Sequence, residues 1–498
     1  MHFFGREDIL RNLDDLWGKG ISSFVTCRGR RRIGKSTLIE RFAELSGARF
    51  IKIEGAKPSP GMSDERERKA FADQLRVQAG TEKARPENWL DAMIRLSSVI
   101  NDNEKTVVLL DEVSWLAHYD RTFSATLKIA WDNYLKKHDR MIFFVCGSVS
   151  TWIKDEFIDN KAFYGRRSLD LIVPELPLCE CVKFWKGKAA NLPTREIFDI
   201  LAVTGGVPRY LEEINPSLTA SENLRRMCFI PKAPLREDFD AMFEDVIMRQ
   251  PTFTGKVRRT LSGGSRTVTE IAAEIGVDKG GNVSSALEQL VESGMVSSDG
   301  GKNPQTGAEI RERRYRLKDN YVRFYLRYIE PIKDSIDGGT FVFKGTEYLS
   351  GWNQVMGLAF ENMVVNHVRD LLKPLHLENA QILSAAPYCR KGSAERGVKG
   401  CQIDLLVQMK SSVCIVEIKR EKRIGVEVVR EMQDKVAAFP RKRGTTLRTA
   451  LVYDGELDPV VEAEGYFDAI VPFRSLLQIG IIGTGAKTMF DKHNGYET

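Results

Sequence analysis

The sequence predicts an α/β protein with a parallel sheet near its N-terminus and further domains after it. Over about the first 210 residues, short apolar runs typical of buried strands alternate with helical patterns. This alternation favours parallel strands joined by covering helices. The chain has 498 residues, which leaves room for about three domains at roughly 150 residues each.

Composition and charge narrow the class of protein. With 42% hydrophobic and 29% charged residues, the chain is typical of globular proteins and unlike collagen, mucins or extensively disordered chains. No apolar run approaches the ~20 residues of a membrane span, and the first residues lack an apolar signal region. A cytoplasmic protein without a membrane partner is therefore expected. The net charge of +6 permits nucleic acid as a partner.

The expected elements follow in chain order. The predicted strands of the first part span 23–27, 48–53, 107–110 and 141–146, and its predicted helices span 35–45 and 122–136. A helical pattern covers about 180–260, and two short helices precede a Gly- and Arg-rich segment over about 265–317. From about residue 340, one long helix (354–372) precedes pairs of strands.

A phosphate-binding loop follows the first predicted strand. Residues 29–36 fit the pattern G-x-x-x-x-G-K-S/T between a strand and a helix, which is the context that this motif requires. The glycines let backbone N–H groups face phosphate oxygens, and the helix N-terminus adds positive potential. Lys35 would reach the β- and γ-phosphates, and Ser36 would bind Mg²⁺. The expected nucleotide-binding residues of the loop are Gly29, Arg32, Ile33, Gly34, Lys35, Ser36 and Thr37.

Two acids end the apolar strand at 107–110. Asp111 would hold the Mg²⁺ shell, and Glu112 would polarise the attacking water as general base. The paired acids favour hydrolysis over nucleotide binding alone. Ser148, after the next strand, would touch the γ-phosphate or the water, or serve as a turn residue; both interpretations stay open.

Several runs together resemble one family. They are Phe-Gly-Arg-Glu at 4–7, Arg-Arg-Arg-Ile-Gly-Lys-Ser at 30–36, Leu-Asp-Glu at 110–112, Cys-Gly-Ser at 146–148 and Gly-Gly-Val-Pro-Arg-Tyr-Leu at 205–211. These runs are similar to those of the archaeal-type ATPases of the AAA+ superfamily. The resemblance covers about the first 230 residues and implies an AAA+ P-loop ATPase with ATP and Mg²⁺ as cofactors.

The resemblance also implies roles for residues outside the loop. Arg6 would lie near the adenine, and Pro208 and Arg209 would contact the nucleotide from a helical lid. Arg166, in the run Tyr-Gly-Arg-Arg at 164–167, is a candidate arginine finger, reaching a neighbouring subunit of a homo-oligomer. A solvated basic turn is the equally weighted alternative for Arg166.

The middle segment has the layout of a winged helix: a helix, a turn, a second helix and a basic hairpin. DNA binding would place the wing arginines on phosphates. Because the exposed face of the second helix carries no Lys or Arg, a module used only for packing remains an equal alternative. The predicted DNA-binding arginines are Arg311, Arg313, Arg314 and Arg316.

Carboxylates mark the last segment. Asp404 lies on a short strand, and Glu417 and Lys419 lie on one face of a second strand thirteen residues on. Paired in register, the three side chains could hold Mg²⁺, orient water and steady the charge on a scissile phosphate.

This pattern resembles the PD-(D/E)xK nuclease fold. The resemblance implies that Glu361 on the preceding helix is a further metal ligand beside Asp404 and Glu417. It also implies that Gln433 and Lys435 on the following helix contact DNA phosphate. Mn²⁺ is an alternative metal there. A domain that keeps the fold and binds without cleaving is the competing interpretation.

The expected organisation is therefore an AAA+ ATPase core (1–175), a helical lid (176–260), a winged helix (261–335) and a C-terminal α/β restriction-endonuclease-like domain (340–498). The expected function is an ATP-hydrolysing protein that binds DNA and cleaves it with a metal-dependent site; the resemblance adds a role in defence against foreign DNA. The alternative is a nucleotide-driven regulatory switch whose last two domains bind DNA or protein without cleavage.

Overall fold

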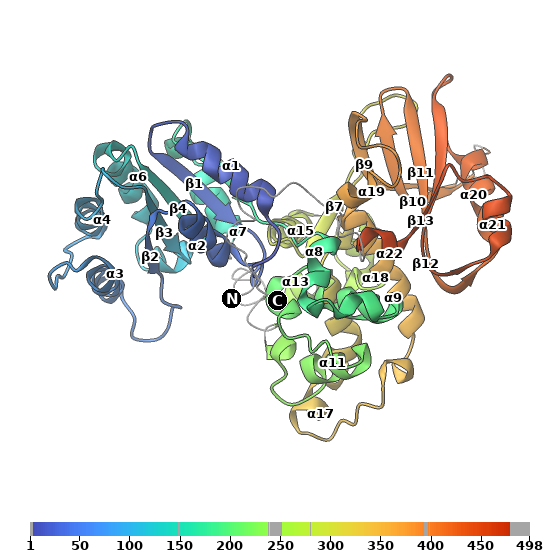
Figure 1. The fold of residues 1–498 in the computed structure, drawn as a ribbon, viewed down its shortest axis with the longest axis horizontal. Helices are drawn as coiled ribbons and strands as arrows, with labels where there is room; N and C mark the ends of the chain where they lie inside the picture. Colours follow the sequence, from blue (N-terminus) through green and yellow to red (C-terminus); the bar gives the residue numbers. More distant parts are fainter. Residues whose placement is uncertain are drawn as a thin grey trace. The chain divides into compact units, whose positions relative to one another are not determined.

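The computed structural model describes residues 3–147, 150–237, 239, 251–278, 280–392, 397 and 399–478. The described residues up to Pro174 form one compact unit, and those from Glu175 form a second unit (Figure 1). Each unit is described by itself.

The first unit is built on a parallel five-stranded sheet with the order β2-β3-β4-β1-β5. The parallel sheet was predicted, and the four predicted strands are present within two residues of their expected ends; β5 was not predicted, because its run alternates polar and apolar residues beside a basic turn. The strands are β1 (Ser23–Arg28), β2 (Arg49–Glu54), β3 (Thr106–Asp111), β4 (Met141–Gly147) and β5 (Arg167–Ile172).

Helices accompany this sheet. The helix α2 has the predicted ends, whereas the helix predicted over 122–136 ends earlier, at Asn133, and a short 3-10 turn follows it. Side chains of α4 and α6 join those of β3 and β4 in one apolar core. The helices are α1 (Glu7–Trp17), α2 (Lys35–Leu45), α3 (Asp64–Ala79), α4 (Trp89–Ser98), α5 (Val113–Leu116), α6 (Phe123–Asn133) and α7 (Ser150–Ile153).

The second unit begins with helices and a small sheet. The three strands of this sheet are antiparallel, in the order β6-β8-β7, and α14 and α15 lie between β6 and β7 in the chain. The buried residues Val283, Leu287 and Leu290 form the apolar face of α15. The elements are α8 (Leu178–Cys181), α9 (Thr194–Thr204), α10 (Pro208–Leu211), α11 (Ala220–Cys228), α13 (Pro251–Thr260), β6 (Arg266–Thr267), α14 (Val268–Ile275), α15 (Gly281–Glu292), β7 (Val296–Asp299), β8 (Arg314–Leu317), α16 (Asn320–Phe324) and α17 (Lys333–Asp337).

A mixed five-stranded sheet completes the second unit, in the order β13-β12-β11-β10-β9. The strands β9, β10 and β11 are antiparallel, and β12 and β13 continue the sheet in parallel. The elements are α18 (Trp352–Asn366), α19 (Val368–Leu371), β9 (Ile382–Arg390), β10 (Cys401–Met409), β11 (Ser412–Ile424), α20 (Glu427–Ala438), β12 (Thr446–Leu457), α21 (Pro459–Ala463), β13 (Ala469–Pro472) and α22 (Phe473–Leu476).

The helix α18 carries residues of this sheet's core and of its candidate site. The single helix predicted over 354–372 is interrupted at His367, whose backbone leaves the helical region and whose ring contacts the Met363 carbonyl. Phe360 of α18 packs edge-to-face against Phe198 of α9 and Phe473 of α22. These contacts fix α18 beside the sheet.

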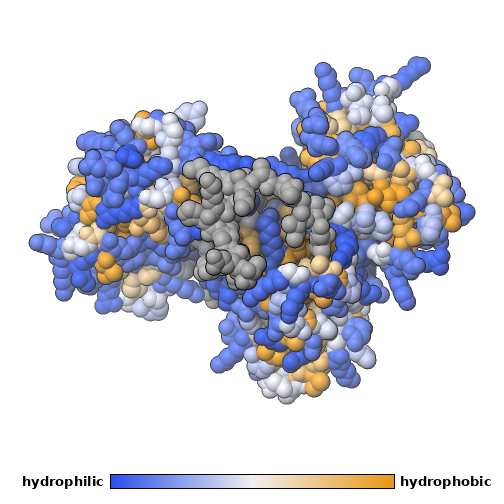
Figure 2. All heavy atoms as spheres, viewed as in Figure 1, coloured by the Kyte–Doolittle hydropathy of each residue, from blue (hydrophilic) through white to orange (hydrophobic). Residues whose placement is uncertain are grey.

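Hydrophilic side chains cover most of the face shown in Figure 2, with smaller hydrophobic areas between them. Among the described residues, no helix combines the length and the apolar character needed to cross a membrane.

Candidate functional site

The phosphate-binding loop joins β1 to α2. Two glycines in the loop have positive φ angles, which residues other than glycine rarely adopt. A Cβ on Gly29 (φ 151°) would lie 2.8 Å from the Val173 carbonyl oxygen. Gly34 (φ 85°) is the N-cap of α2, and Arg32 between them also has a positive φ of 67°. The backbone conformation of the loop thus explains why glycines occupy these two positions of the motif.

The structure brings the predicted residues of the loop and of β3 together. Lys35, 7% exposed, donates through Nζ to the carbonyl oxygens of Gly29 (3.0 Å) and Arg30 (3.2 Å). Ser36 Oγ donates to Asp111 Oδ2 at 2.6 Å. Because hydroxyl and carboxylate oxygens are the ligands that Mg²⁺ prefers, one ion could contact both residues, and the loop fits ATP with Mg²⁺. Thr37 follows in the first turn of α2.

A lysine on the neighbouring strand was missed by sequence reasoning. Lys52 of β2 places Nζ 3.1 Å from Asp111 Oδ2 and 3.1 Å from Glu54 Oε2. Burial acts against its charge, but the two carboxylates outweigh that and raise the pKa of Lys52. Its position near the carboxyl end of a strand in the same parallel sheet was the signal that could have found it.

Glu112 lies at the carboxyl edge of the sheet. It has a positive φ of 46° and is the N-cap of α5. A Cβ on Gly147, at the end of β4, would lie 3.9 Å from Glu112 Oε2. The carboxylate is therefore near the start of the segment that contains Ser148, but Ser148 itself lies outside the described residues.

Arg6 contacts the loop directly. Its Nη2 donates to the Ile33 carbonyl oxygen at 3.3 Å, and the residue is only 8% exposed. This bond links Arg6 to the backbone of the phosphate-binding loop, and the place of Arg6 beside the adenine stays a prediction.

Arg166 makes a bidentate ion pair within its own unit. Its Nε and Nη2 donate to the two carboxylate oxygens of Asp132 at 2.8 and 2.9 Å. The pKa of Asp132 is lowered to about 2, mainly by the hydrogen bond from Arg166. The finger role stays a prediction, and in this structure the side chain ties the turn before β5 to α6.

Pro208 and Arg209 belong to the second unit. Pro208 is the first residue of α10, and exposed Arg209 pairs with Glu212 (3.2 Å) and Glu213 (2.7 Å). The preceding glycines have a packing role, because Gly206 donates to Glu175 Oε2 and a Cβ there would lie 2.7 Å from the Leu176 nitrogen.

In the mixed sheet, the antiparallel register brings two predicted carboxylates together. Leu405 of β10 pairs with Val416 of β11, so Asp404 lies opposite Glu417. Asp404 Oδ2 accepts a hydrogen bond from the Ile418 nitrogen at 3.0 Å. Burial, with a further contribution from Glu417, raises the pKa of Asp404 to about 7.

Two lysines contact these carboxylates. Lys435 of α20 is hydrogen-bonded to Glu417 Oε2 and lies 3.9 Å from Asp404 Oδ1. Lys419 lies 3.4 Å from Glu417 Oε1 and 2.7 Å from Glu431 Oε2. Lys435 was predicted to contact phosphate; in this structure it pairs with Glu417. The acid Glu431, one turn before Lys435 on α20, was not predicted.

Glu361 faces the same region from α18. Burial raises its pKa, against the positive charges of Arg323, Arg316 and Lys435. In the described part of the chain, no three His, Cys, Asp or Glu side chains group closely enough to hold a metal ion. The structure thus brings Asp404 and Glu417 together without completing a three-ligand cluster with Glu361. Gln433 is exposed on α20.

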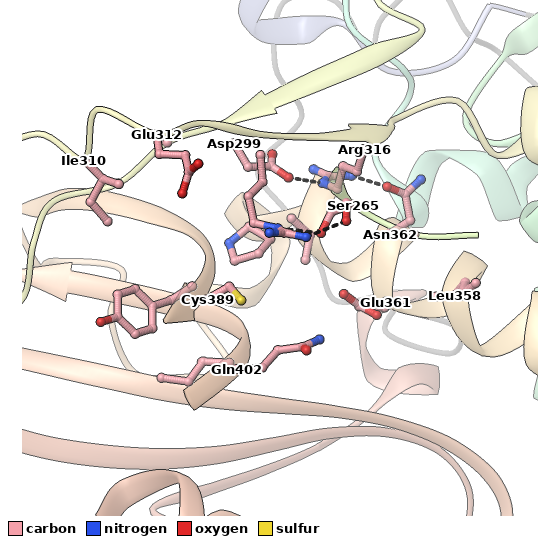
Figure 3. Close-up of a pocket in the computed structure, with 18 of the residues that line it drawn as sticks. Ser265, Asp299, Ile310, Glu312, Arg316, Leu358, Glu361, Asn362, Cys389 and Gln402 are labelled. Atoms are coloured by element: carbon pink, nitrogen blue, oxygen red, sulfur yellow. Dashed lines mark hydrogen bonds and ion pairs between the residues drawn. The ribbon is translucent and has the colours of Figure 1, made fainter. Parts of the chain in front are cut away.

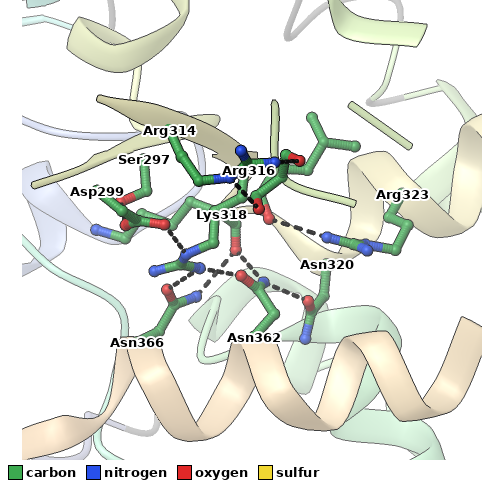
Figure 4. A network of polar contacts seen from close by, with 11 residues as sticks. Ser297, Asp299, Arg314, Arg316, Lys318, Asn320, Arg323, Asn362 and Asn366 are labelled. Carbon is green, nitrogen blue, oxygen red and sulfur yellow. Dashed lines mark hydrogen bonds and ion pairs between the residues drawn. The ribbon is translucent and has the colours of Figure 1, made fainter. Parts of the chain in front are cut away.

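The four wing arginines have different environments. Arg311 and Arg313 are exposed, whereas Arg314 donates to the Ser265 carbonyl at 2.6 Å and to its hydroxyl at 3.2 Å. The prediction that Arg316 contacts DNA needs correction. Its guanidinium is buried in a network with Asp299, Asn362 and Asn366, as Figure 4 shows, because β8 packs there on α18.

Comparisons with known proteins match the first part of the chain to a family model. Residues 3–214 match the model of an ATPase domain found predominantly in Archaea. The matched residues of this ATPase domain include the phosphate-binding loop, Asp111 and Glu112. The domain is a P-loop ATPase, and a nucleotide, typically with Mg²⁺, is its cofactor.

Individual proteins that match this chain have low sequence identity to it. An uncharacterized protein of Methanocaldococcus jannaschii is 24% identical over 378 residues, or 74% of this chain and 78% of that protein. A Walker-type ATPase of Pyrococcus abyssi aligns with 65% of this chain and 96% of its own at 18% identity, with a TM-score of 0.48. The ORC2 protein of Aeropyrum pernix aligns with 67% of this chain and 94% of its own at 14% identity, with a TM-score of 0.41.

Proposed function

We propose that this ATPase binds DNA and cleaves it at a metal-dependent site around Asp404, Glu417 and Lys419. The observation that carries the proposal is the cross-strand pairing of Asp404 with Glu417, with Lys419 beside Glu417 at 3.4 Å. Two carboxylates could bind Mg²⁺ or Mn²⁺, and the lysine would steady charge on the phosphate. Defence against foreign DNA is the biological role that the proposal retains.

The chain organisation supports this proposal. The antiparallel strands β9 to β11 continue through α20 into parallel β12, which agrees with a restriction-endonuclease-like domain over 340–498. The helices α14 and α15 with the sheet β6-β8-β7 agree with a winged helix over 261–335. The proposed division keeps the ATPase core at 1–175 and the lid at 176–260, with homo-oligomers formed through the ATPase domain.

Exposed polar side chains form the proposed DNA surface. They are Arg311 and Arg313 on the wing and Gln433 on α20. Replacing Arg311 and Arg313 together with Ala should weaken DNA binding and reduce its salt slope by roughly one per lost phosphate contact. Arg316→Ala is the control; because Arg316 is buried, its salt slope should equal that of the unmodified protein.

A nucleotide-driven switch without cleavage is the second candidate. Lys435 favours it, because its ammonium is bonded to Glu417 and lies 3.9 Å from Asp404, where it occupies part of the space that a metal ion would need. In that case ATP turnover would control binding of DNA or protein by the second unit.

The decisive experiment incubates the full chain with plasmid and linear DNA in Mg²⁺ or Mn²⁺, with and without ATP. The matched variants are Asp404→Asn and the exposed-acid control Asp434→Asn. Cleavage lost in the first variant and kept in the second supports the nuclease. Absence of cleavage in every condition, with ATP hydrolysis intact, supports the switch instead.

A further inference from the structure

A polar cavity separates the small sheet from the mixed sheet within the second unit. Its volume is about 300 Å³, at the lower end of the range of small-ligand pockets. Figure 3 shows Glu361 and Asn362 of α18 on one side, Asp299 and Arg316 above them, and Gln402 of β10 opposite. The cavity thus adjoins the region of Asp404 and Glu417 through Glu361.

Two of the three arginines that line this cavity have hydrogen-bond partners within the protein. Arg316 bonds to Asp299 at 2.7 Å and to Asn366 at 2.9 Å. Arg314 bonds to Ser265. These arginines have little capacity left for a ligand.

Arg323 of α16 differs from them. It lines the cavity and is only 3% exposed. Its Nη2 makes one long hydrogen bond, 3.4 Å, to the Leu317 carbonyl (Figure 4). Within the described part of the chain, neither its Nε nor its Nη1 has a hydrogen-bond partner. A buried guanidinium with two unsatisfied donors is costly, and burial lowers the pKa of Arg323 to about 10.

We propose that this cavity binds a phosphate group, held by Nε and Nη1 of Arg323 beside Glu361. Phosphate oxygens are the acceptors that guanidinium donors match best. The opposing charge of Glu361 acts against a bound anion, and a cation held by the neighbouring carboxylates would relieve that repulsion. Apolar lining residues such as Leu358 and Ile403 leave a surface for a sugar or base.

The inference deepens the proposed nuclease function and rests on it for the source of the phosphate. A strand held at Arg323 would bring a neighbouring phosphodiester toward Asp404 and Glu417. Free nucleotide or inorganic phosphate shares the same chemistry. Arg323 acts in this proposal as a positioning residue for the substrate.

The test measures binding by titration calorimetry in EDTA, where no cleavage occurs, so its failure is separable from failure of the nuclease proposal. Every protein carries Lys35→Ala to remove phosphate binding at the ATPase loop. The probes are inorganic phosphate, a 5′-mononucleotide and a short single-stranded oligodeoxynucleotide. Arg323→Met should weaken binding at least about tenfold, whereas Glu361→Gln, which removes the opposing charge, should strengthen it.

The control variant is Arg236→Met, because Arg236 is also buried but does not line the cavity. It should leave binding unchanged. Tighter binding of the oligonucleotide than of phosphate assigns the site to a nucleic-acid strand, and equal affinities assign it to free phosphate. Equal binding by Arg323→Met and its parent would overturn the proposal, as would weaker binding by Glu361→Gln. If Arg323→Met does not fold, Arg323→Lys and Glu361→Gln provide the same comparison.

Discussion

The ATPase loop and the carboxylate pair of the mixed sheet use similar residues in opposite ways. In the loop, Lys35 bonds to backbone carbonyls, while Asp111 accepts from Ser36 and pairs with Lys52. In the mixed sheet, Lys435 bonds directly to Glu417, and Lys419 lies between Glu417 and Glu431. The lysine beside the phosphate-binding backbone thus bonds to neutral carbonyls, whereas both lysines of the second region pair with acids.

This difference shows that the same residue types can have different bonding partners in two sites of one chain. A lysine bonded to neutral carbonyls exchanges those bonds for phosphate at small cost. A lysine bonded to a buried carboxylate must give up an ion pair before a metal ion can take its place.

The largest effect is expected at the loop. Lys35→Ala should lower ATP turnover about 100-fold or more, because the ammonium stabilises charge on the transferring phosphate. Steady-state ATP hydrolysis measures it, with the exposed residue in Lys19→Ala as the control. Turnover equal to that of the control would remove Lys35 from the site.

Glu112→Gln should separate binding from hydrolysis. The amide cannot accept a proton from water, so turnover should fall about 100-fold while nucleotide affinity is unchanged. Single-turnover hydrolysis and equilibrium binding of a fluorescent ATP analogue measure the two quantities. The exposed acid in Glu82→Gln should change neither, and full turnover in Glu112→Gln would exclude Glu112 as the base.

The carboxylate pair should give a pH-dependent stability of definite sign. The pKa of Asp404 is raised from 3.8 to about 7, so the folded state binds this proton more tightly than the unfolded chain. Its contribution to stability is present below about pH 4 and is lost as the pH rises through about 7. In EDTA, Asp404→Asn should therefore lose less thermal stability than the unmodified protein between about pH 5 and about pH 8.

Thermal unfolding at the two pH values measures this difference, and Asp434→Asn is the exposed-acid control on α20. Identical pH profiles for Asp404→Asn and the unmodified protein would contradict the raised pKa of Asp404.

The smallest effect is expected at Arg166. Because Arg166 and Asp132 form a partly exposed bidentate pair, a double-mutant cycle of Arg166→Ala and Asp132→Ala should give a coupling of up to about 1 kcal/mol in the free energy of unfolding. Urea unfolding measures it. A loss of ATP turnover in Arg166→Ala that Asp132→Ala does not share would instead favour the finger role.

Sequence reasoning reached the first sheet and its loop because their signals are local. The strands β1, β3 and β4 are continuous apolar runs, and the glycines of the loop are set by backbone geometry at each position. The strands β12 and β13 and the acid Glu431 were missed, because a parallel strand in a mixed sheet and a single helical acid carry no distinctive pattern.

The sequence by itself determined the ATPase domain, since a contiguous motif between a strand and a helix specifies both fold and ligand. It also placed Asp404 and Glu417 on adjacent strands, which the antiparallel register brought together. Only the tertiary structure decided that Arg316 is buried against α18, that Lys435 pairs with Glu417, and that Arg323 retains unsatisfied donors. The environment of a charged side chain depends on partners far away in the chain, and no local pattern records those partners.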